Sequence, residues 1–305
     1  MLGKDAGSVK KDNNRSSDSR TRRSFLQAAG IGSAACITGI VGSAPGLAEQ
    51  TAGTKVLGGT TKGLAFELAV ASYTFRKFDL AKTLDMTRRL GFKFIALKDY
   101  HLPLDSTPET IAEVVADVKK AGLELYGGGV IYMNSEAEVN QAFDYAKAAG
   151  MKVIIGVPKP ELLPQVNEKA RQYDVKVAIH NHGPGDKLYP TPDSVYEKIK
   201  GLDRRLGLCN DIGHTMRAGV DPSESAERLA DRLLDVHMKD VSAANAKGKT
   251  VEIGRGVIDI PKFLRALVKV GYAGKVAFEY EKDADDPMPG LAESIGYVRG
   301  VLAAI

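Results

Sequence analysis

The sequence predicts an α/β fold, a single-domain (β/α)8 or TIM barrel. From residue 64 to the C-terminus, short apolar segments typical of buried parallel strands alternate with segments of helical periodicity. Eight such pairs fill about 250 residues, the usual size of an eight-stranded barrel. An open doubly wound sheet would instead place a glycine-rich phosphate loop after the first strand, where residues 71–75 read ASYTF. Nucleotide binding is therefore not expected.

The predicted strands are short apolar runs bounded by polar or glycine residues. Runs of this kind, without strict alternation of polar and apolar residues, are typical of parallel strands that are buried on both faces. The eight strands are predicted at Glu67–Ser72, Phe94–Lys98, Leu123–Tyr126, Val153–Gly156, Lys176–His180, Leu206–Asp211, Leu234–Lys239 and Lys275–Glu279.

The predicted helices between the strands carry start and stop signals. Thr107 is a capping residue followed by a proline at the first helical position, and Asp221 stands before a proline in the same way. Gly91 and Gly122 each follow a helix, where a left-handed residue is favoured. The eight helices are predicted at Leu80–Leu90, Pro108–Ala121, Glu136–Ala149, Pro160–Tyr173, Thr191–Ile199, Ser223–Arg232, Pro261–Val270 and Gly290–Leu302.

The N-terminal segment predicts export. Residues 1–23 are polar and basic, and residues 24–48 are uncharged and rich in Ala, Gly and Ile. With Arg22 and Arg23 at the junction, this order is typical of a twin-arginine signal peptide, which we predict at residues 1–48. A transmembrane anchor is disfavoured because glycines break the apolar run, and Cys36 weakly matches a lipoprotein cleavage site. Residues 49–63 are predicted as a flexible lead-in and residues 64–305 as the barrel domain.

Removing the signal changes what the charge implies. The whole chain has a formal net charge of +4, and residues 1–23 carry the same +4, so residues 49–305 are neutral. A neutral surface does not favour nucleic acid as a partner. Only Cys209 remains after cleavage, which excludes an internal disulfide and suits folding before export. We expect a periplasmic or secreted protein without stable membrane insertion after cleavage, and homo-oligomer formation stays open.

All five histidines lie near the carboxyl ends of predicted strands, where barrels of this kind carry their functional groups. Four consecutive strands bring His180, Asp211, His237 and Glu279 to this end, and we predict that these four bind one divalent metal ion. Two imidazoles and two carboxylates favour Mn²⁺ or Co²⁺, with Zn²⁺ as an alternative, over Ca²⁺ and Mg²⁺. A single histidine at a strand end is as readily a hydrogen-bonded rim residue.

Other polar residues at this end are candidates for proton transfer or substrate contact. Lys98 and His101 close the second strand and are candidate acids or bases, although an exposed loop explains them equally well. Lys239 shares a strand face with His237, because side chains two apart point the same way, and it could stabilise a developing oxyanion. By the same spacing His182 is expected to face the substrate, and Tyr73 could stack on a sugar or line the barrel top.

The order of these motifs resembles the xylose isomerase-like TIM-barrel superfamily, the sugar phosphate isomerase/epimerase group that includes D-tagatose 3-epimerase. The resemblance covers residues 64–305, and its more specific segments are DIGH (211–214), HMKD (237–240), GRGVID (254–259) and the late Glu279. It implies metal binding by Asp211, His237 and Glu279. It also implies substrate contacts by His214 and Arg255.

One position departs from this pattern. The epimerases of the family place a glutamate at the end of the fifth strand, where it binds metal and acts as one of two opposed acid/bases, and this chain has His180 there. The resemblance implies proton abstraction next to a carbonyl group, with a metal-stabilised enediolate and Glu279 among the catalytic residues. We expect a metal-dependent isomerase or epimerase that acts on an unphosphorylated sugar or keto-sugar, because an exported enzyme rarely meets sugar phosphates.

Two alternatives remain at this point. A lyase or hydratase acting on 3-keto-glycosides needs proton chemistry on one side only, which the loss of the fifth-strand glutamate favours. A non-catalytic periplasmic sugar-binding barrel is the alternative of another class. Endonuclease IV shares the fold, but export and a neutral surface argue against DNA repair.

Overall fold

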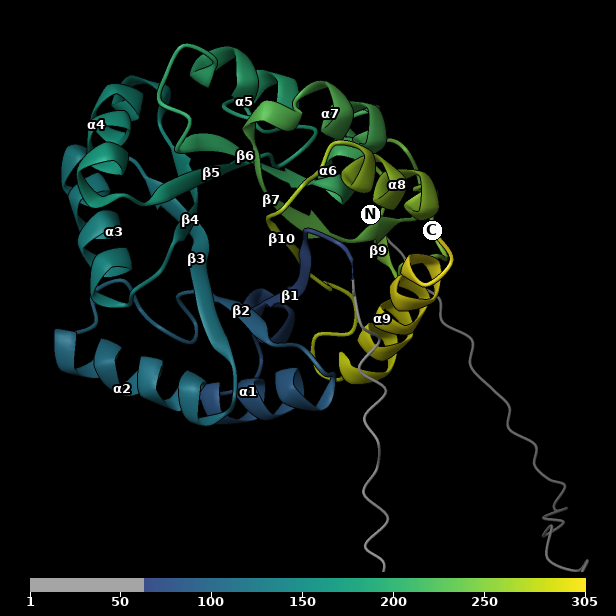
Figure 1. Cartoon of the computed structure of the whole chain (residues 1–305), viewed down its shortest axis with the longest axis horizontal. Coiled ribbons are helices and arrows are strands. Elements are labelled where there is room, and N and C mark those ends of the chain that lie inside the picture. The colour runs from purple at the N-terminus through teal and green to yellow at the C-terminus, as the bar shows by residue number, and fades with distance from the viewer. Residues whose placement is uncertain (1–62) are drawn as a thin grey trace, which may run out of the picture. The chain divides into compact units, whose positions relative to one another are not determined.

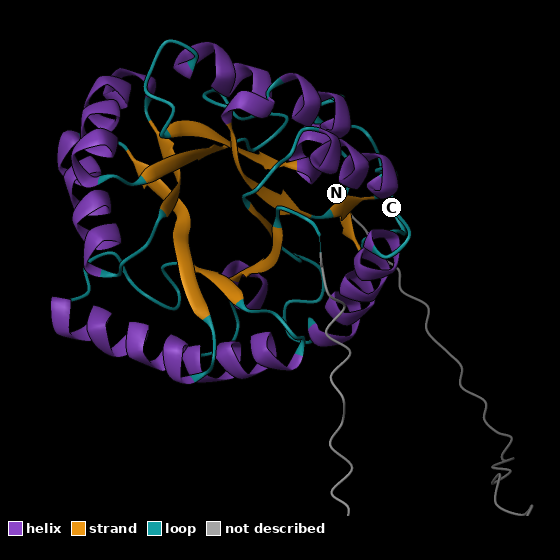
Figure 2. Cartoon of the chain, viewed as in Figure 1, coloured by secondary structure: helices purple, strands orange, loops and turns teal. Residues whose placement is uncertain are grey.

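The computed structural model describes residues 63–305, and these form a closed barrel of eight parallel strands. Around the barrel the strands follow one another in chain order, and β10 closes the ring between β7 and β1. Because neighbouring strands are parallel, each connection crosses back outside the barrel, and the helices surround the strands as an outer ring (Figures 1 and 2). The predicted fold class, a single (β/α)8 barrel, is confirmed.

The barrel strands lie close to their predicted positions, and most of their residues are buried. The largest difference is the third strand, which continues seven residues beyond its predicted end. Glycines allow its close approach to β4, since a side chain at Gly127 would begin 2.8 Å from the backbone oxygen of Val153. The strands are β1 (Glu67–Ala71), β2 (Phe94–Leu97), β3 (Glu124–Met133), β4 (Val153–Pro158), β5 (Lys176–His180), β6 (Leu206–Asp211), β7 (Leu233–Met238) and β10 (Lys275–Phe278).

Side-chain caps start most of the helices. Thr107 caps α2, and Thr191 forms a capping box with Ser194 at the start of α5. The helices are α1 (Leu80–Arg89), α2 (Pro108–Lys120), α3 (Glu136–Ala148), α4 (Leu163–Tyr173), α5 (Pro192–Ile199), α6 (Ile212–Arg217), α7 (Pro222–Arg228), α8 (Ile260–Lys269) and α9 (Met288–Leu302), with short 3-10 turns η1 (Ser72–Phe75), η2 (Pro160–Leu162) and η3 (Ala230–Arg232).

Two features were not predicted. The short helix α6 follows β6 directly, and a small antiparallel pair, β8 (Asp240–Val241) with β9 (Thr250–Val251), follows β7. Both lie at the carboxyl ends of the strands, so they help to build the mouth of the barrel. The predicted helix at Ser223–Arg232 is divided, because α7 ends at Arg228 and η3 follows it.

The predicted signal peptide, residues 1–48, and all but the last residue of the lead-in lie outside the described residues. Within residues 63–305, no helix is long and apolar enough to cross a membrane.

Strand register sets the position of the polar side chains inside the barrel. On β6 and β7, Cys209 pairs with Asp235 and, two residues further, Asp211 pairs with His237. The Tyr126 hydroxyl on β3 lies 3.4 Å from Asp235 Oδ2 on β7. Because β3 and β7 are not neighbours, this contact crosses the interior and shows that Asp235 points inward. His237, two residues later on the same face, therefore points inward at the mouth.

Candidate active site at the carboxyl ends of the strands

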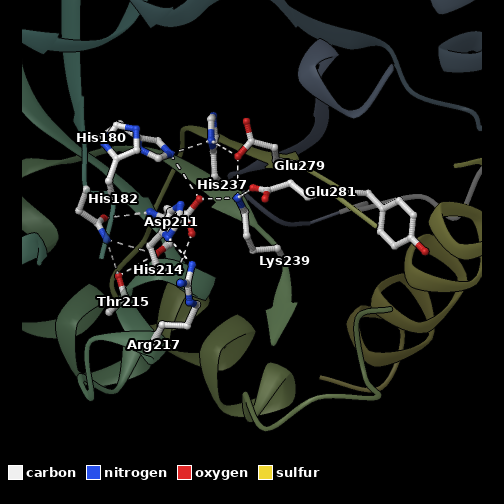
Figure 3. A network of polar contacts seen from close by, with 12 residues as sticks. His180, His182, Asp211, His214, Thr215, Arg217, His237, Lys239, Glu279 and Glu281 are labelled. Carbon is white, nitrogen blue, oxygen red and sulfur yellow. Dashed lines mark hydrogen bonds and ion pairs between the residues drawn. The ribbon is translucent and has the colours of Figure 1, made fainter. Parts of the chain in front are cut away.

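Four side chains from consecutive strand ends meet inside the mouth of the barrel. His180, Asp211, His237 and Glu279 are all buried, and one donor atom from each lies within 4.8 Å of the others. His180 Nε2 lies 3.1 Å from His237 Nδ1 and 3.3 Å from Asp211 Oδ2 (Figure 3). His237 Nδ1 lies 3.2 Å from Glu279 Oε2. The structure thus brings the four predicted ligands together, and metal binding by them remains a prediction.

The position of Asp211 is fixed by the start of α6. Its Oδ1 accepts a hydrogen bond from the backbone N–H of His214 at 2.7 Å and caps the helix, which leaves Oδ2 for the cluster. The side chain of Asn181 accepts from the backbone N–H of Asp211 at 3.1 Å and donates to Thr215 at 3.1 Å. These bonds tie the end of β5 to the end of β6 and orient the carboxylate.

Lys239 lies at the centre of the cluster and is 3% exposed. Its Nζ is 2.8 Å from Asp211 Oδ2, 2.7 Å from Glu279 Oε2 and 2.5 Å from Glu281 Oε1 (Figure 3). Gly213 of α6 leaves room for its aliphatic stem, because a Cβ there would lie 2.5 Å from Lys239 Cγ. The predicted catalytic lysine is therefore held among three carboxylates.

The charges of this group follow from the contacts. Burial disfavours ionised carboxylates, but the Lys239 ammonium outweighs it and holds the pKa values of Asp211 and Glu279 well below their usual range. Burial likewise opposes the charge of Lys239, but Asp211 and Glu279 raise its pKa well above the ordinary value. Burial lowers the pKa of His180 to about 3, so its imidazole is neutral near pH 7. Burial also opposes a charge on His237, but its neighbours Cys209 and Glu279 raise the pKa of this imidazole well above the ordinary value. In the metal-free site the charges of Asp211 and Glu279 are therefore balanced by Lys239 and by a protonated His237, shielded from water.

Above the cluster lies a cavity of about 240 Å³. This is somewhat smaller than the about 300–1,000 Å³ of typical ligand pockets, so it suits a small polar molecule. Four of its lining residues, Tyr73, Lys98, His182 and His214, were predicted for catalysis or substrate contact. The other lining residues are Val130, Tyr132, His180, Glu279 and Glu281.

Two neutral imidazoles form one side of this cavity. The Tyr132 hydroxyl lies 3.2 Å from His182 Nε2, and the two rings are stacked with centroids 5.8 Å apart. Arg217, one turn along α6, lies 3.3 Å from His214 Nδ1. Burial lowers the pKa of both histidines, which keeps them uncharged. An uncharged imidazole has one donor and one acceptor, which suits hydroxyl groups of a substrate.

The opposite side of the cavity is formed by Lys98 and Tyr73. The Lys98 ammonium donates to the backbone oxygen of Val130 at 2.7 Å and lies 3.3 Å from Asp99. The guanidinium of Arg76 lies 4.7 Å from the centre of the Tyr73 ring. Both predicted residues are thus within the lining, where a substrate would meet them.

Two predicted site residues lie neither at the cavity nor in the buried cluster. His101 is buried between η1 and α1, with Nδ1 2.9 Å from Ser72 Oγ and Nε2 3.0 Å from Thr83 Oγ1. Arg255 does not line the cavity, and its exposed guanidinium pairs with Glu293 at 2.5 and 2.8 Å. In this structure His101 holds the loop after β2 in place, and Arg255 lies on the surface.

The GRG segment instead shapes a loop. The buried Asp240 carboxylate accepts hydrogen bonds from the backbone N–H groups of Gly254 and Gly256, each at 3.0 Å. A side chain at Gly256 would begin 2.1 Å from this carboxylate, so the loop requires glycine there. The HMKD and GRG segments are therefore joined by Asp240.

Three further residues contact the site and have no role in the predictions from the sequence. Glu281 shares the strand spacing of Glu279, which pointed to the mouth without showing its contact with Lys239. Asp186 lies 3.4 Å from His182, four residues earlier, and Arg217 contacts His214, three residues earlier. The three-residue spacing of His214 and Arg217 places both side chains on one face of a helix, but this could be used only once α6 was known.

The donor set fits a divalent cation. Four buried donor atoms, two of them anionic, face one another within 4.8 Å. The oxygens Asp211 Oδ2 and Glu279 Oε2 lie close enough together to contact one cation, as their shared contact with the Lys239 ammonium shows. Imidazole together with carboxylate suits Mn²⁺, Co²⁺ or Zn²⁺.

Comparison with known proteins agrees with this architecture. The chain is similar to the rhizopine catabolism protein MocC of Rhizobium meliloti, with 28% identity over 150 residues, 44% of this chain and 46% of that protein. It is 28% identical over 129 residues to the inosose dehydratase of Geobacillus kaustophilus, covering 35% of this chain and 40% of that protein. The matched part is thus less than half of either relative.

Solved structures show the same fold. A 3-keto-D-glucoside 4-epimerase of E. coli superposes with a TM-score of 0.65 over 77% of this chain and 99% of that one, at 16% identity. Identity this low supports the shared barrel alone. The model of the xylose isomerase-like TIM barrel family matches residues 84–301, from within α1 to near the end of α9. The closed eight-stranded barrel and this match together show that the chain belongs to the xylose isomerase-like TIM barrel family.

Proposed function

We propose that this chain is a metal-dependent enzyme that removes a proton next to the carbonyl group of an unphosphorylated sugar or keto-sugar. The observation that carries the proposal is the buried cluster of His180, Asp211, His237 and Glu279 around the Lys239 ammonium. Such a cluster concentrates charge in a site shielded from water, where it acts strongly on a developing anion.

The groups divide the chemistry between them. A divalent ion held by the four ligands would polarise the substrate carbonyl. The Glu279 carboxylate borders the cavity and is in place to accept the proton from the adjacent carbon. The Lys239 ammonium, 2.5 Å from Glu281 at the cavity lining, can donate to the oxygen as its negative charge grows. His182 and His214 would bind the remaining hydroxyls.

An isomerase or epimerase returns the proton to another carbon or face, and this is the function we propose first. A lyase, which expels a β-substituent instead, is the second candidate.

The carboxylates that border the cavity, Glu279 and Glu281, both follow β10, whereas the imidazoles His180 and His182 lie at the end of β5 and just after it. The placement of both carboxylates on one side of the cavity favours elimination. The resemblance to an inosose dehydratase, whose name describes the loss of water, supports the same candidate.

The charge of the cavity supports a substrate without a phosphate group. Among the residues that line it in the described structure, Lys98 has the one side chain with a permanent positive charge, and its ammonium already binds the Val130 carbonyl. Phosphate sites normally use several N–H donors or an arginine fork. Export of the protein, which remains a prediction from residues 1–48, would also place it away from sugar phosphates.

Hydrogen exchange tests the proposal directly. Full-length protein loaded with Mn²⁺ is incubated in D₂O with glucose, a ketose, an inosose and a 3-keto-glucoside, and the substrate protons are followed by NMR. Exchange without loss of a group supports the isomerase or epimerase. Exchange with release of water or aglycone supports the lyase. Failure to exchange any substrate that demonstrably binds would contradict enolisation and leave a non-catalytic sugar-binding barrel.

A further inference from the structure

The Lys239 ammonium occupies the position at which the candidate ligands converge. It contacts Asp211 Oδ2 at 2.8 Å and Glu279 Oε2 at 2.7 Å. These are the same two oxygens that face the imidazole nitrogens, since Asp211 Oδ2 lies 3.3 Å from His180 Nε2 and Glu279 Oε2 lies 3.2 Å from His237 Nδ1. Both oxygens that a metal ion would bind therefore already lie against a cation.

A divalent ion and this ammonium group would compete for the same two oxygens. Two cations that share one pair of carboxylates repel each other strongly in a buried site of low dielectric constant. Movement of the lysine tip away from Asp211 and Glu279 would therefore favour metal entry.

Glu281 is a suitable partner for the displaced tip. The stem of Lys239 is confined by Gly213, where a Cβ would lie 2.5 Å from Cγ and 2.7 Å from Cδ, so the end of the chain has more freedom than its base. Glu281 Oε1 already lies 2.5 Å from Nζ, lines the cavity and is not among the four ligands. An ammonium that releases Asp211 and Glu279 can remain paired with Glu281.

We propose that Lys239 is a built-in counter-cation that competes with the metal: it neutralises Asp211 and Glu279 in the metal-free protein and moves to Glu281 when a divalent ion binds. This proposal rests on the proposed function, because it assumes that the four ligands take a metal. It assigns Lys239 a second role besides contact with the substrate oxygen. It also gives Glu281 the role of holding the displaced ammonium.

Metal affinity measured without substrate tests the competition. Isothermal titration of the metal-free protein with Mn²⁺ should show a Kd about tenfold lower or more for Lys239→Met than for the wild type, a change of about 1.4 kcal/mol or more. Metal-free K239M should also melt at a lower temperature, and Mn²⁺ should raise its Tm by more than it raises that of the wild type. Lys239→Gln is a second uncharged variant and should tighten binding in the same direction.

Matched variants separate competition from general charge effects. Lys98→Met removes the lysine charge that lines the neighbouring cavity. Since the Lys98 ammonium binds the Val130 carbonyl rather than the ligands, Kd should change by less than about twofold. Glu281→Gln should weaken Mn²⁺ binding in the wild-type background, because the displaced ammonium loses its partner. The same substitution should have little effect in the K239M background.

The outcomes are distinct. An equal or weaker Mn²⁺ affinity in both K239M and K239Q would overturn the inference and leave the proposed function standing. Equal weakening by E281Q in both backgrounds would overturn the displacement to Glu281. Binding by K239M but not by the wild type would support competition in its strongest form. Failure of the wild type and both lysine variants to bind Mn²⁺, Co²⁺ or Zn²⁺ would overturn this inference together with the metal-dependent part of the proposed function.

Discussion

The exchange of Asp211 for asparagine separates the two tasks of this carboxylate. Asp211 is fully buried, its Oδ1 caps α6 through the backbone N–H of His214, and its Oδ2 contacts the Lys239 ammonium. Asparagine caps helices as well as aspartate does. Asp211→Asn therefore removes the charge and retains the cap, whereas Asp211→Ala removes both.

The expected loss of stability follows from these contacts. Removal of one partner from a buried ion pair typically costs about 3–5 kcal/mol. Lys239 retains Glu279 and Glu281, so we expect the lower end of this range, about 3 kcal/mol, for D211N. The lost cap should add about 1 kcal/mol in D211A. For a domain of this size, 1 kcal/mol corresponds to about 2–4 °C, so Tm should fall by about 6–12 °C in D211N and further in D211A.

Thermal unfolding followed by circular dichroism in the presence of EDTA measures both differences, and a Mn²⁺ titration of the same proteins measures the ligand role. D211N should bind Mn²⁺ far more weakly than the wild type. A free energy of unfolding for D211N within about 1 kcal/mol of the wild type would refute the buried ion pair. Equal stabilities of D211N and D211A would refute the capping role. Unchanged Mn²⁺ affinity in both would refute the assignment of Asp211 as a ligand.

Three further predictions concern residues around the site. Gly213→Ala should push the Lys239 stem and cost about 1–3 kcal/mol in urea unfolding, and an unchanged stability would contradict this crowding. The hydrogen bond from Lys282 lowers the pKa of Glu252 to about 2, so this carboxylate stabilises the fold fully above its unfolded-state pKa and progressively less as the pH falls toward about 2. The difference in the free energy of unfolding between the wild type and Glu252→Gln should therefore shrink as the pH falls over that range. A difference that grows would contradict this role. His101→Ala should lower stability by about 1–3 kcal/mol and preserve turnover at 25 °C, whereas loss of turnover at unchanged stability would restore its catalytic assignment.

The grouping of side chains at the strand ends could be predicted from the sequence because two simple rules apply there. Parallel barrels expose the carboxyl ends of all strands at one mouth, and strand spacing selects which side chains face inward. These rules are sufficient to bring His180, Asp211, His237 and Glu279 together, as the structure shows. The two rules could not predict the contact of Lys239 with three carboxylates, because this contact depends on the length and direction of a flexible side chain.

Residues beyond the strand ends were harder to place, since loops have no fixed period. The loop after β2 turns inward, so His101 binds Ser72 and Thr83 instead of facing the mouth. The Asp240 carboxylate holds the GRG loop by its backbone, which leaves the Arg255 side chain on the outer surface. Helix α6 was missed for a related reason: at six residues it is too short to show a helical period.

The imidazole at the end of β5 has a consequence for the direction of proton transfer. His180 has a pKa of about 3, so near pH 7 its imidazole is uncharged and cannot act as an imidazolium acid. A metal bound to the ring nitrogen that faces the cluster would also occupy the lone pair that His180 would need to act as a base. Return of a proton on the β5 side would then fall to His182, which lines the cavity and is also uncharged. A neutral imidazole at a rim hydrogen-bonded to Tyr132 is a weaker acid than the imidazolium. Reactions whose last proton transfer takes place at Glu279 or Glu281, on the β10 side, need no second acid on the opposite face of the cavity. The residues of this site therefore suit them better than reactions that need such an acid.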